Sequence, residues 1–392
     1  MPSVNSFETD MRKLRRKRRT KRYVKNLAFV FAVLVVAGLI YITKDAWLDY
    51  FDGILAKAQT GAAVQNDGEL AGGNYPIDIS KKTNTSIGKI QKFWTLFADT
   101  AFYVYDSSGD IVYSEQASYS NPIVEQSERR TLVYDQGGYN FTVLGPRKQI
   151  YSKRLSDQIL LGSVGADGSV AIVTQNDKYD SYLTIYDKNG SEIYHWADGT
   201  MIMAAAIDQN GKGCILASVY ARGGDYKTVL TRLNFDETEV ELQTAPVETL
   251  AFEVAYCSGG MWLVGDDRLV RFNSDGGVEQ TFEYNYQLSS FSLSEKLAAL
   301  AFKGAGGNGE IAVIQAESQS TYVAAAAYEI ADVYASDSRV YILESSKIDA
   351  LDSGGNLVAT APLDTVYREF SVLGDEIFLL GYHTVEKIEF SV

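Results

Sequence analysis

Short segments in which hydrophobic and polar residues alternate fill the chain from Tyr75 to its end. Gly, Asp, Asn and Ser separate these segments, and no long segment with helical spacing interrupts them. Alternation with a period of two residues is typical of β-strands that bury one face. The pattern therefore predicts an all-β domain over residues 75–392.

One hairpin pattern recurs along this domain. A strand of aromatic or aliphatic residues ends in Asp or Asn, a short turn with Gly follows, and a second strand begins. Successive turns are about 36 to 47 residues apart. The clearest copies are Phe102–Tyr113 and Leu183–Tyr194, followed by looser copies at Leu269–Val278 and Ile348–Val358 and degenerate ones near Gly145, Asn234 and Ala316.

A period near 40 residues predicts a β-propeller whose blades have four strands each. A single four-stranded sheet cannot bury both of its faces, whereas copies stacked around an axis can. Each hairpin needs an inner pair of strands before it, and Ile159–Thr174 and Leu250–Gly265 have the expected pattern of two apolar strands around a turn.

The end of the chain decides between seven and eight blades. Seven hairpins allow seven blades, but three more strands follow the last hairpin at residues 369–373, 376–381 and 385–391. Tyr75–Ile79 can supply the missing outer strand, which would close the ring and remove its free edges. Eight blades, about 40 residues each, are therefore favoured, and seven remain the alternative.

A hydrophobic run precedes the domain. Leu27–Thr43 is 17 residues long without a charge, and at about 1.5 Å per residue it nearly spans a ~30 Å hydrocarbon core. It predicts a transmembrane helix. Residues 44–60 have helical spacing and predict a juxtamembrane amphipathic helix, which continues the span, lies on the membrane surface or pairs with a second copy. Residues 61–74 contain four Gly and predict a flexible linker.

Charge differs sharply between the two sides of this run. Residues 1–26 carry ten Lys or Arg against two acidic residues, a net charge of +8, whereas the rest of the chain carries −22. The positive-inside rule places the basic tail in the cytoplasm, beside anionic lipid headgroups, and the β domain outside the cell. The alternative of a nucleic-acid-binding arm is disfavoured next to a membrane span. Ala56–Ala58 lies too far from the run for a signal-peptide cleavage site, so the run is interpreted as an anchor.

Five segments carry a resemblance to a known family. They are Tyr75–Ser80 (YPIDIS), Phe102–Gly109 (FYVYDSSG), Leu132–Gly138 (LVYDQGG), Val173–Tyr179 (VTQNDKY) and Leu183–Gly190 (LTIYDKNG). Through them the chain resembles uncharacterised proteins of clostridial, Gram-positive bacteria that have a basic tail, one membrane span and a propeller-like domain of unknown function. More distantly, the repeats are similar to WD40 and quinoprotein-like propellers. The resemblance implies architecture and a place in the cell envelope, and it implies no reaction.

The sequence predicts no catalytic, cofactor-binding or metal-ligating residue. It lacks the Gly-x-Ser-x-Gly, His-Glu-x-x-His and phosphate-loop motifs. Its two histidines, His195 and His383, are far apart, and His195 is interpreted as an ordinary half-exposed side chain. Cys214 and Cys257 are interpreted as small buried residues, although a disulfide between them is permitted outside the cell.

Two ligands suggested by the repeats are disfavoured. Quinoprotein-like propellers hold pyrroloquinoline quinone, but this chain has no adjacent Cys pair and its four Trp do not recur at one repeat position. The Asp-x-x-Gly turns at Asp106, Asp187 and Asp352 have too few carboxylates for a calcium loop. They are interpreted as turns in which the Asp side chain accepts hydrogen bonds from its own backbone.

A non-enzymatic scaffold that binds a protein, peptide or glycan at the cell envelope is the favoured function. The alternatives are a hydrolase or quinoprotein-like enzyme with carboxylates at the propeller mouth, and a sensor that dimerises through residues 44–60. Converging carboxylates at the mouth would indicate catalysis, and an aromatic or charged rim would indicate binding.

Overall fold

The computed structural model describes residues 74–175 and 177–390. The predicted tail 1–26, transmembrane helix 27–43, amphipathic helix 44–60 and all of the linker except Asn74 lie outside these residues. Within the described part, the one helix is the 3-10 turn η1 (Ala305–Gly307). No helix there has the length and apolar character that crossing a membrane requires.

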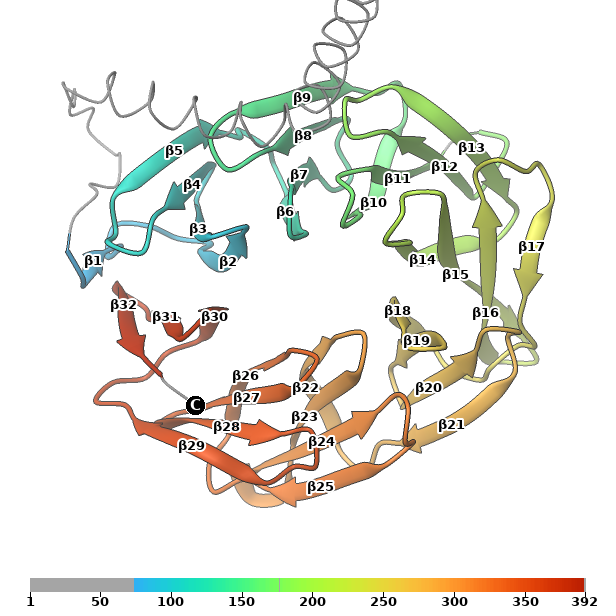
Figure 1. The fold of residues 1–392 in the computed structure, drawn as a ribbon. Helices are drawn as coiled ribbons and strands as arrows, with labels where there is room; N and C mark the ends of the chain where they lie inside the picture. Colours follow the sequence, from blue (N-terminus) through green and yellow to red (C-terminus); the bar gives the residue numbers. More distant parts are fainter. Residues whose placement is uncertain (1–73, 176, 391–392) are drawn as a thin grey trace, which may run out of the picture. The chain divides into compact units, whose positions relative to one another are not determined.

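Eight antiparallel sheets of four strands each are arranged in a ring around a common axis (Figure 1). The predicted propeller with eight blades is therefore confirmed, and the alternative with seven is wrong. In each blade the first strand lies nearest the axis and the fourth at the rim.

The first four blades follow one another along the chain without a break. Their strands are β2 (Ser86–Ile90), β3 (Phe93–Ala98), β4 (Ala101–Tyr105) and β5 (Ile111–Gln116); β6 (Pro122–Gln126), β7 (Thr131–Asp135), β8 (Asn140–Leu144) and β9 (Gln149–Arg154); β10 (Gln158–Val164), β11 (Val170–Gln175), β12 (Ser181–Tyr186) and β13 (Glu192–Asp198); and β14 (Met201–Ile207), β15 (Gly213–Arg222), β16 (Asp225–Asn234) and β17 (Val240–Gln243).

The other four blades continue the same order until the last. Their strands are β18 (Ala251–Cys257), β19 (Gly260–Gly265), β20 (Arg268–Asn273) and β21 (Val278–Glu283); β22 (Gln287–Leu293), β23 (Leu297–Lys303), β24 (Gly309–Gln315) and β25 (Thr321–Ala325); β26 (Ile330–Ala335), β27 (Arg339–Glu344), β28 (Lys347–Asp352) and β29 (Leu357–Pro362); and β30 (Glu369–Leu373), β31 (Glu376–Leu380), β32 (Thr384–Glu389) and β1 (Ile77–Asp78).

The eighth blade is built from both ends of the described chain. Strand β1 pairs antiparallel with β32, where Ile77 lies opposite Val385. The Ile79 amide extends this pairing by donating to the His383 carbonyl at 2.7 Å. The predicted closure of the ring by the segment at 75–79 is therefore confirmed.

The hydrophobic core lies between neighbouring blades. Each of the eight junctions holds its own cluster of buried side chains. The second strands are sandwiched on both faces, so they are nearly continuous in apolar residues, and all six residues of β3 are buried. At the closing junction Trp94 stacks on Tyr105 and on Phe378, with ring centroids 4.2 and 5.3 Å away.

Ile77→Ala should destabilise the ring, because Ile77 is only 4% exposed and packs in the closing cluster. We expect a loss of about 2–4 kcal/mol in the free energy of unfolding, measured by urea denaturation. The matched control is Ile193→Ala on rim strand β13, where the side chain is 45% exposed, and it should cost less than about 0.5 kcal/mol. Equal losses of unfolding free energy for the two substitutions would show that packing of β1 in the closing junction does not stabilise the ring.

Candidate functional site

The strand order gives the ring two faces with different kinds of connection. Because neighbouring strands are antiparallel, the connection into each first strand and the turn between the second and third strands lie at one end of the blade. The turns between the first and second strands, and between the third and fourth, lie at the other end. We call the first end the aromatic face and the second the turn face.

The turn face carries the Asp-x-x-Gly turns. The Oδ1 atoms of Asp106, Asp187 and Asp352 each accept a hydrogen bond from the amide two residues on, at 3.0, 2.9 and 2.9 Å. Gly closes all three turns with a positive φ of 83–89°, which disfavours any side chain. The interpretation as backbone-capping turns is confirmed. Among the described residues, no group of three or more His, Cys, Asp or Glu could hold a metal ion.

The aromatic face carries a concentration of exposed hydrophobic side chains. Eight large hydrophobic residues, each 39–64% exposed, lie in its connections or at the strand ends beside them. The other six such residues in the described part of the chain lie in fourth strands at the rim. The eight are Tyr179, Met201, Tyr226, Phe252, Tyr286, Tyr328, Val366 and Tyr382.

Five of the eight lie where the innermost strands of the fourth to eighth blades begin. Met201 is the first residue of β14 and Phe252 the second of β18. Tyr286, Tyr328 and Val366 lie one to three residues before β22, β26 and β30. The register of β18 shifts between Ala251 and Glu253, so Phe252 is the extra residue of a β-bulge. Bulges redirect side chains, and Phe252 is 46% exposed.

Carboxylates on the innermost strands connect neighbouring blades. Asp332 accepts hydrogen bonds from the hydroxyl of Ser290 at 3.0 Å, from its neighbour Val333 at 2.9 Å and from the Phe370 amide at 3.4 Å. Glu369 accepts one from the Ile87 amide at 3.2 Å. An innermost strand has no sheet partner on its axial side, so these side chains satisfy amides that the sheet leaves unpaired. Burial raises the pKa of Asp332 to about 6.

The side chains of Gln126 and Lys89 also connect the first blade to other blades by hydrogen bonds. Gln126 Oε1 accepts from the Lys89 amide at 2.9 Å. It lies so close to Gly88 that a Cβ there would come within 1.7 Å of the oxygen. Lys89 Nζ donates to the Tyr334 hydroxyl at 2.7 Å and to the Val372 carbonyl at 3.1 Å. Lys89 thus joins the first, seventh and eighth blades on the axial side.

Two glutamates on innermost strands have raised pKa values. Glu125 lies on β6 and Glu253 on β18, on different sides of the axis in Figure 1. Burial raises the pKa of Glu253 to about 7. Burial, together with the charge of Glu253, raises the pKa of Glu125 to about 8. The sequence alone could not show this pair, because 128 residues separate the two positions.

A cavity of about 970 Å³ opens along the innermost strands toward the turn face. Lys89, Asp332 and Tyr334 line its axial part, and Gln91 and Arg129 line the end beside the turns. It is the larger of the two cavities described for residues 74–175 and 177–390, and both cationic and anionic groups face it.

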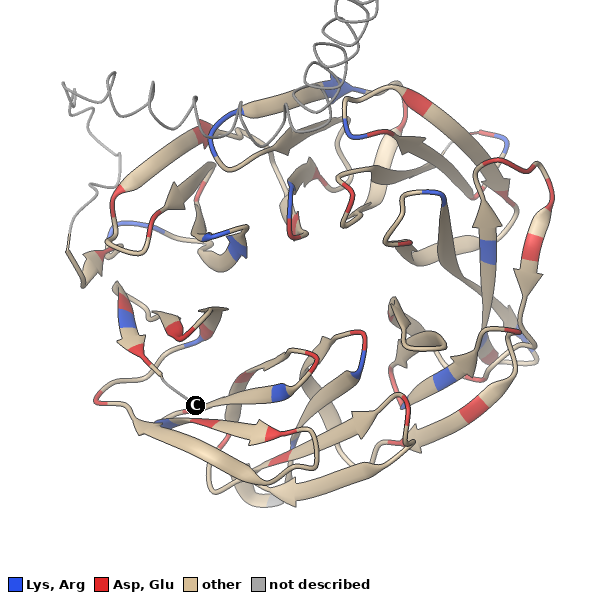
Figure 2. Ribbon diagram, in the orientation of Figure 1, with Lys and Arg blue, Asp and Glu red and all other residues tan. Residues whose placement is uncertain are grey.

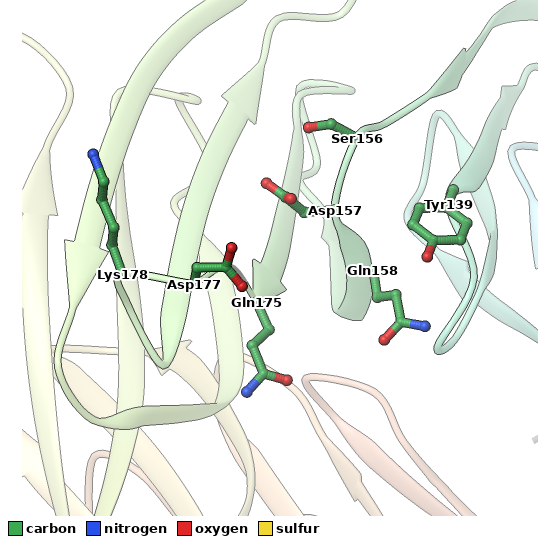
Figure 3. Close-up of a pocket in the computed structure, with 7 residues that line it drawn as sticks. All are labelled: Tyr139, Ser156, Asp157, Gln158, Gln175, Asp177 and Lys178. Atoms are coloured by element: carbon green, nitrogen blue, oxygen red, sulfur yellow. The ribbon is translucent and has the colours of Figure 1, made fainter.

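A smaller cavity of about 670 Å³ lies on the aromatic face (Figure 3). Ser156 and Asp157 line it from the β9–β10 connection, and Asp177 and Lys178 from the β11–β12 turn. Tyr139 closes one side in the close-up. Its lining is polar and exposed, so it resembles a surface hollow more than an enclosed ligand site.

The remaining residues singled out from the sequence lie away from the axis. His195 is half-exposed on rim strand β13, where its ring stacks on Tyr182 at 5.7 Å, and the interpretation as an ordinary side chain is confirmed. Cys214 and Cys257 are buried and unpaired with each other, as their interpretation as small core residues requires. Burial raises the pKa of Cys257 to about 11, which leaves the thiol unreactive at neutral pH.

Comparison with known proteins identifies the family. The profile of DUF5711, a family of unknown function, matches residues 72–390. The chain belongs to this family. No curated protein sequence matches this DUF5711 chain.

Solved structures share the fold of this DUF5711 domain at low sequence identity. Sqt1 of Saccharomyces cerevisiae has a TM-score of 0.61 and 10% identity over 83% of this chain and 100% of Sqt1. Sqt1 of Chaetomium thermophilum, solved bound to the N-terminus of ribosomal protein L10, has 0.57 and 13% over 82% and 100%. BamB of Moraxella catarrhalis has 0.52 and 11% over 80% and 100%. These similarities support the propeller fold alone.

The stability of the domain should fall with pH through titration of Glu125. Its folded pKa of about 8 lies above the ordinary value of 4.5, so its contribution is fully present below pH ~4.5 and is lost as pH rises through ~8. Glu125→Gln should therefore match wild type near pH 5 and exceed it near pH 9, by on the order of 1–2 kcal/mol because the Glu125 side chain is partly exposed and solvent screens its charge. Urea denaturation at both pH values measures this difference.

Glu239→Gln, in the exposed β16–β17 turn, removes the same charge and should leave the pH dependence unchanged. A gain in stability for Glu125→Gln that is equal at pH 5 and pH 9 would contradict the raised pKa.

Proposed function

We propose that this DUF5711 propeller is a scaffold that binds a polypeptide partner on its aromatic face, outside the cell, while residues 27–43 anchor it in the membrane. The observation that carries the proposal is the uneven distribution of exposed hydrophobic residues. Eight lie on one face and none in the turns of the other, within the described residues.

The types of residue on the aromatic face favour a protein interface. Tyr, Phe and Met are enriched at the centres of protein interfaces, where a ring or thioether buries much area at small entropic cost. Exposed apolar side chains that gather on one face of a domain often mark such a site. Five of the eight residues lie where the innermost strands of five successive blades begin, so a peptide lying along this part of the face would contact several blades at once.

The solved complexes of similar rings are compatible with this binding mode. The Chaetomium thermophilum Sqt1 structure contains the N-terminus of ribosomal protein L10. At 13% identity, this supports only the view that a ring of this architecture can hold a peptide, and it names no partner for the DUF5711 chain.

The proposed location rests on charge and hydropathy. A tail of net charge +8 precedes a charge-free run of 17 residues, and a chain of net charge −22 follows it, as expected for a cytoplasmic tail, an anchor and an outer domain. The sensor hypothesis depends on residues 44–60, which lie outside the described part of the chain.

Catalysis by Glu125 and Glu253 is the second candidate, favoured by the raised pKa of both carboxyls and by the charge of Glu253, which contributes to the raised pKa of Glu125. One carboxyl with a raised pKa could donate a proton while the other acts as base, as in glycoside hydrolysis. Turnover of a glycoside or peptide substrate that is abolished by Glu125→Gln or by Glu253→Gln would support this candidate over the scaffold.

The proposed scaffold predicts a partner adduct from one face only. A photo-crosslinking amino acid at Phe252 or Tyr328, on the aromatic face, should give a discrete adduct in intact cells, detected by mass spectrometry. The same probe at Ser108 or Asn189, in exposed turns of the other face, should give none. Equal adducts from both faces would contradict the proposal.

Paired substitutions test whether the exposed side chains themselves bind. Phe252→Ser with Tyr328→Ser should abolish the adduct formed from a probe at Tyr286, because exposed apolar contacts are lost while the fold is kept. Val278→Ser with Leu357→Ser removes similarly exposed side chains from the rim and should leave that adduct intact.

The proposed orientation predicts one-sided labelling in intact cells. Because Cys214 and Cys257 are buried, they should not react with a membrane-impermeant maleimide. Ser108→Cys, on the exposed β4–β5 turn, should react fully, and Ser6→Cys in the tail should react only after the cells are lysed. Labelling of Ser6→Cys in intact cells would overturn the orientation.

A further inference from the structure

A cluster of basic residues lies on the turn face, at the first and second blades. Three turns contribute to it: β2–β3, β6–β7 and β8–β9. They contain five Lys or Arg and one acidic residue, Glu128, although the chain beyond the tail carries a net charge of −22. Blue segments gather around β2 and these turns in Figure 2. We call the five residues the basic turns: Lys92, Arg129, Arg130, Arg147 and Lys148.

Contacts hold the three turns together. The Gln91 amide donates to the Glu128 carbonyl at 2.9 Å, which joins β2–β3 to β6–β7. The cations of Lys92 and Arg147 lie 5.6 and 5.3 Å from the ring centre of the same residue, Phe93, which joins β2–β3 to β8–β9. The basic turns therefore form one patch assembled from two blades.

The patch is both accessible and continuous with the axial cavity. Lys92, Arg129 and Lys148 are exposed. Arg129 also lines the cavity of about 970 Å³, whose wall includes the ammonium-bearing Lys89 farther in. A ligand on the patch could thus extend from the turns into the mouth of the cavity, where Arg129 lies at the entrance and Lys89 farther in.

We propose that the basic turns bind a soluble polyanion that carries several phosphate groups. Arg guanidinium groups bind phosphate oxygens in pairs, and Lys adds point charges. Cations spread over three neighbouring turns suit a ligand with several anionic groups better than a single phosphate ion. This site lies on the opposite face from the proposed partner surface, and it does not depend on it.

Charge on the rest of the turn face disfavours an anionic membrane as the ligand. A flat bilayer would approach all of the turns on this face, and many of those outside the patch are acidic. An anionic surface would be repelled there within a Debye length of ~10 Å, whereas a narrow polyanion can contact the basic turns alone. These turns contain Asp106 and Asp110, Asp236 and Glu237, Asp275, and Glu317.

Binding of inorganic polyphosphate to the full-length chain in neutral phosphatidylcholine nanodiscs tests the proposal. The ten Lys and Arg of residues 1–26 are replaced by Gln throughout, so that the tail does not bind the probe. We expect binding at 50 mM salt that weakens at 300 mM, and a loss of about tenfold or more for Lys92→Glu with Arg129→Glu. Fluorescence anisotropy of labelled polyphosphate measures the affinity.

The matched control is Lys212→Glu with Lys296→Glu. These exposed lysines lie in the β14–β15 and β22–β23 turns of the same face, so the change in net charge and in turn type is the same. This pair should weaken binding by less than about threefold. Circular dichroism and thermal unfolding of both double variants confirm that each retains the fold.

Three results would overturn the proposal. Equal losses in the two double variants would show attraction by net charge alone. Absence of polyphosphate binding at 50 mM salt would show that the basic turns are not a polyanion-binding site. The domain in nanodiscs could instead bind phosphatidylglycerol vesicles through Lys92 and Arg129 and fail to bind polyphosphate. That result would show that the patch binds a second, anionic membrane.

Discussion

The short pairing of β1 with β32 is the constraint on which the rest of the ring depends. Without it β32 would be a free edge and Trp94, Tyr105 and Phe378 would lose part of the cluster that contains Ile77 and Ile79. Free edges invite pairing with other chains. Closure also gives every blade two neighbours, so both faces of each sheet are buried without any helix or second layer. The directions of all the strands, and hence the two faces of the ring, then follow.

In every blade the innermost strand has a sheet partner on one side only, so its axial edge is unpaired. This explains the polar side chains near the axis. Asp332, Glu369, Gln126 and Lys89 each form a hydrogen bond to another blade. Carboxylates near the axis can therefore serve as hydrogen-bond acceptors for unpaired backbone amides, without any role in chemistry on a substrate. Glu125 and Glu253 differ, because burial raises the pKa of both carboxyls and the charge of Glu253 also raises that of Glu125. The proposal for function therefore rests on the exposed side chains of the aromatic face and not on the carboxylates near the axis.

Much of the architecture could be predicted from the sequence because its signals are local. Spacing of the recurring hairpin turns predicted the blade period, and the three unpaired strands after residue 368 required the segment near Ile77 as their fourth. The alternation of polar and apolar residues along a strand indicates which neighbouring blade a side chain faces. It does not indicate which side chains lie near the axis together, so Glu125 and Glu253 could not be predicted as a pair. The difference between the two faces could not be predicted either. Nothing in the sequence distinguishes the exposed Tyr179, Tyr328 and Tyr382 from a buried tyrosine such as Tyr105, and the structure separates them by strand direction and burial.

The two faces would use different physical forces, and this makes their proposed roles separable. Apolar contact around Phe252 and Tyr328 changes little with ionic strength, because it depends on area removed from water. Attraction by Lys92 and Arg129 weakens as salt rises, because released counterions and screening dominate binding to a polyanion. Because the two surfaces lie at opposite ends of the blades, a ligand on one would leave the other open. Coupling between them would require an element with two alternative arrangements that both ligands bias.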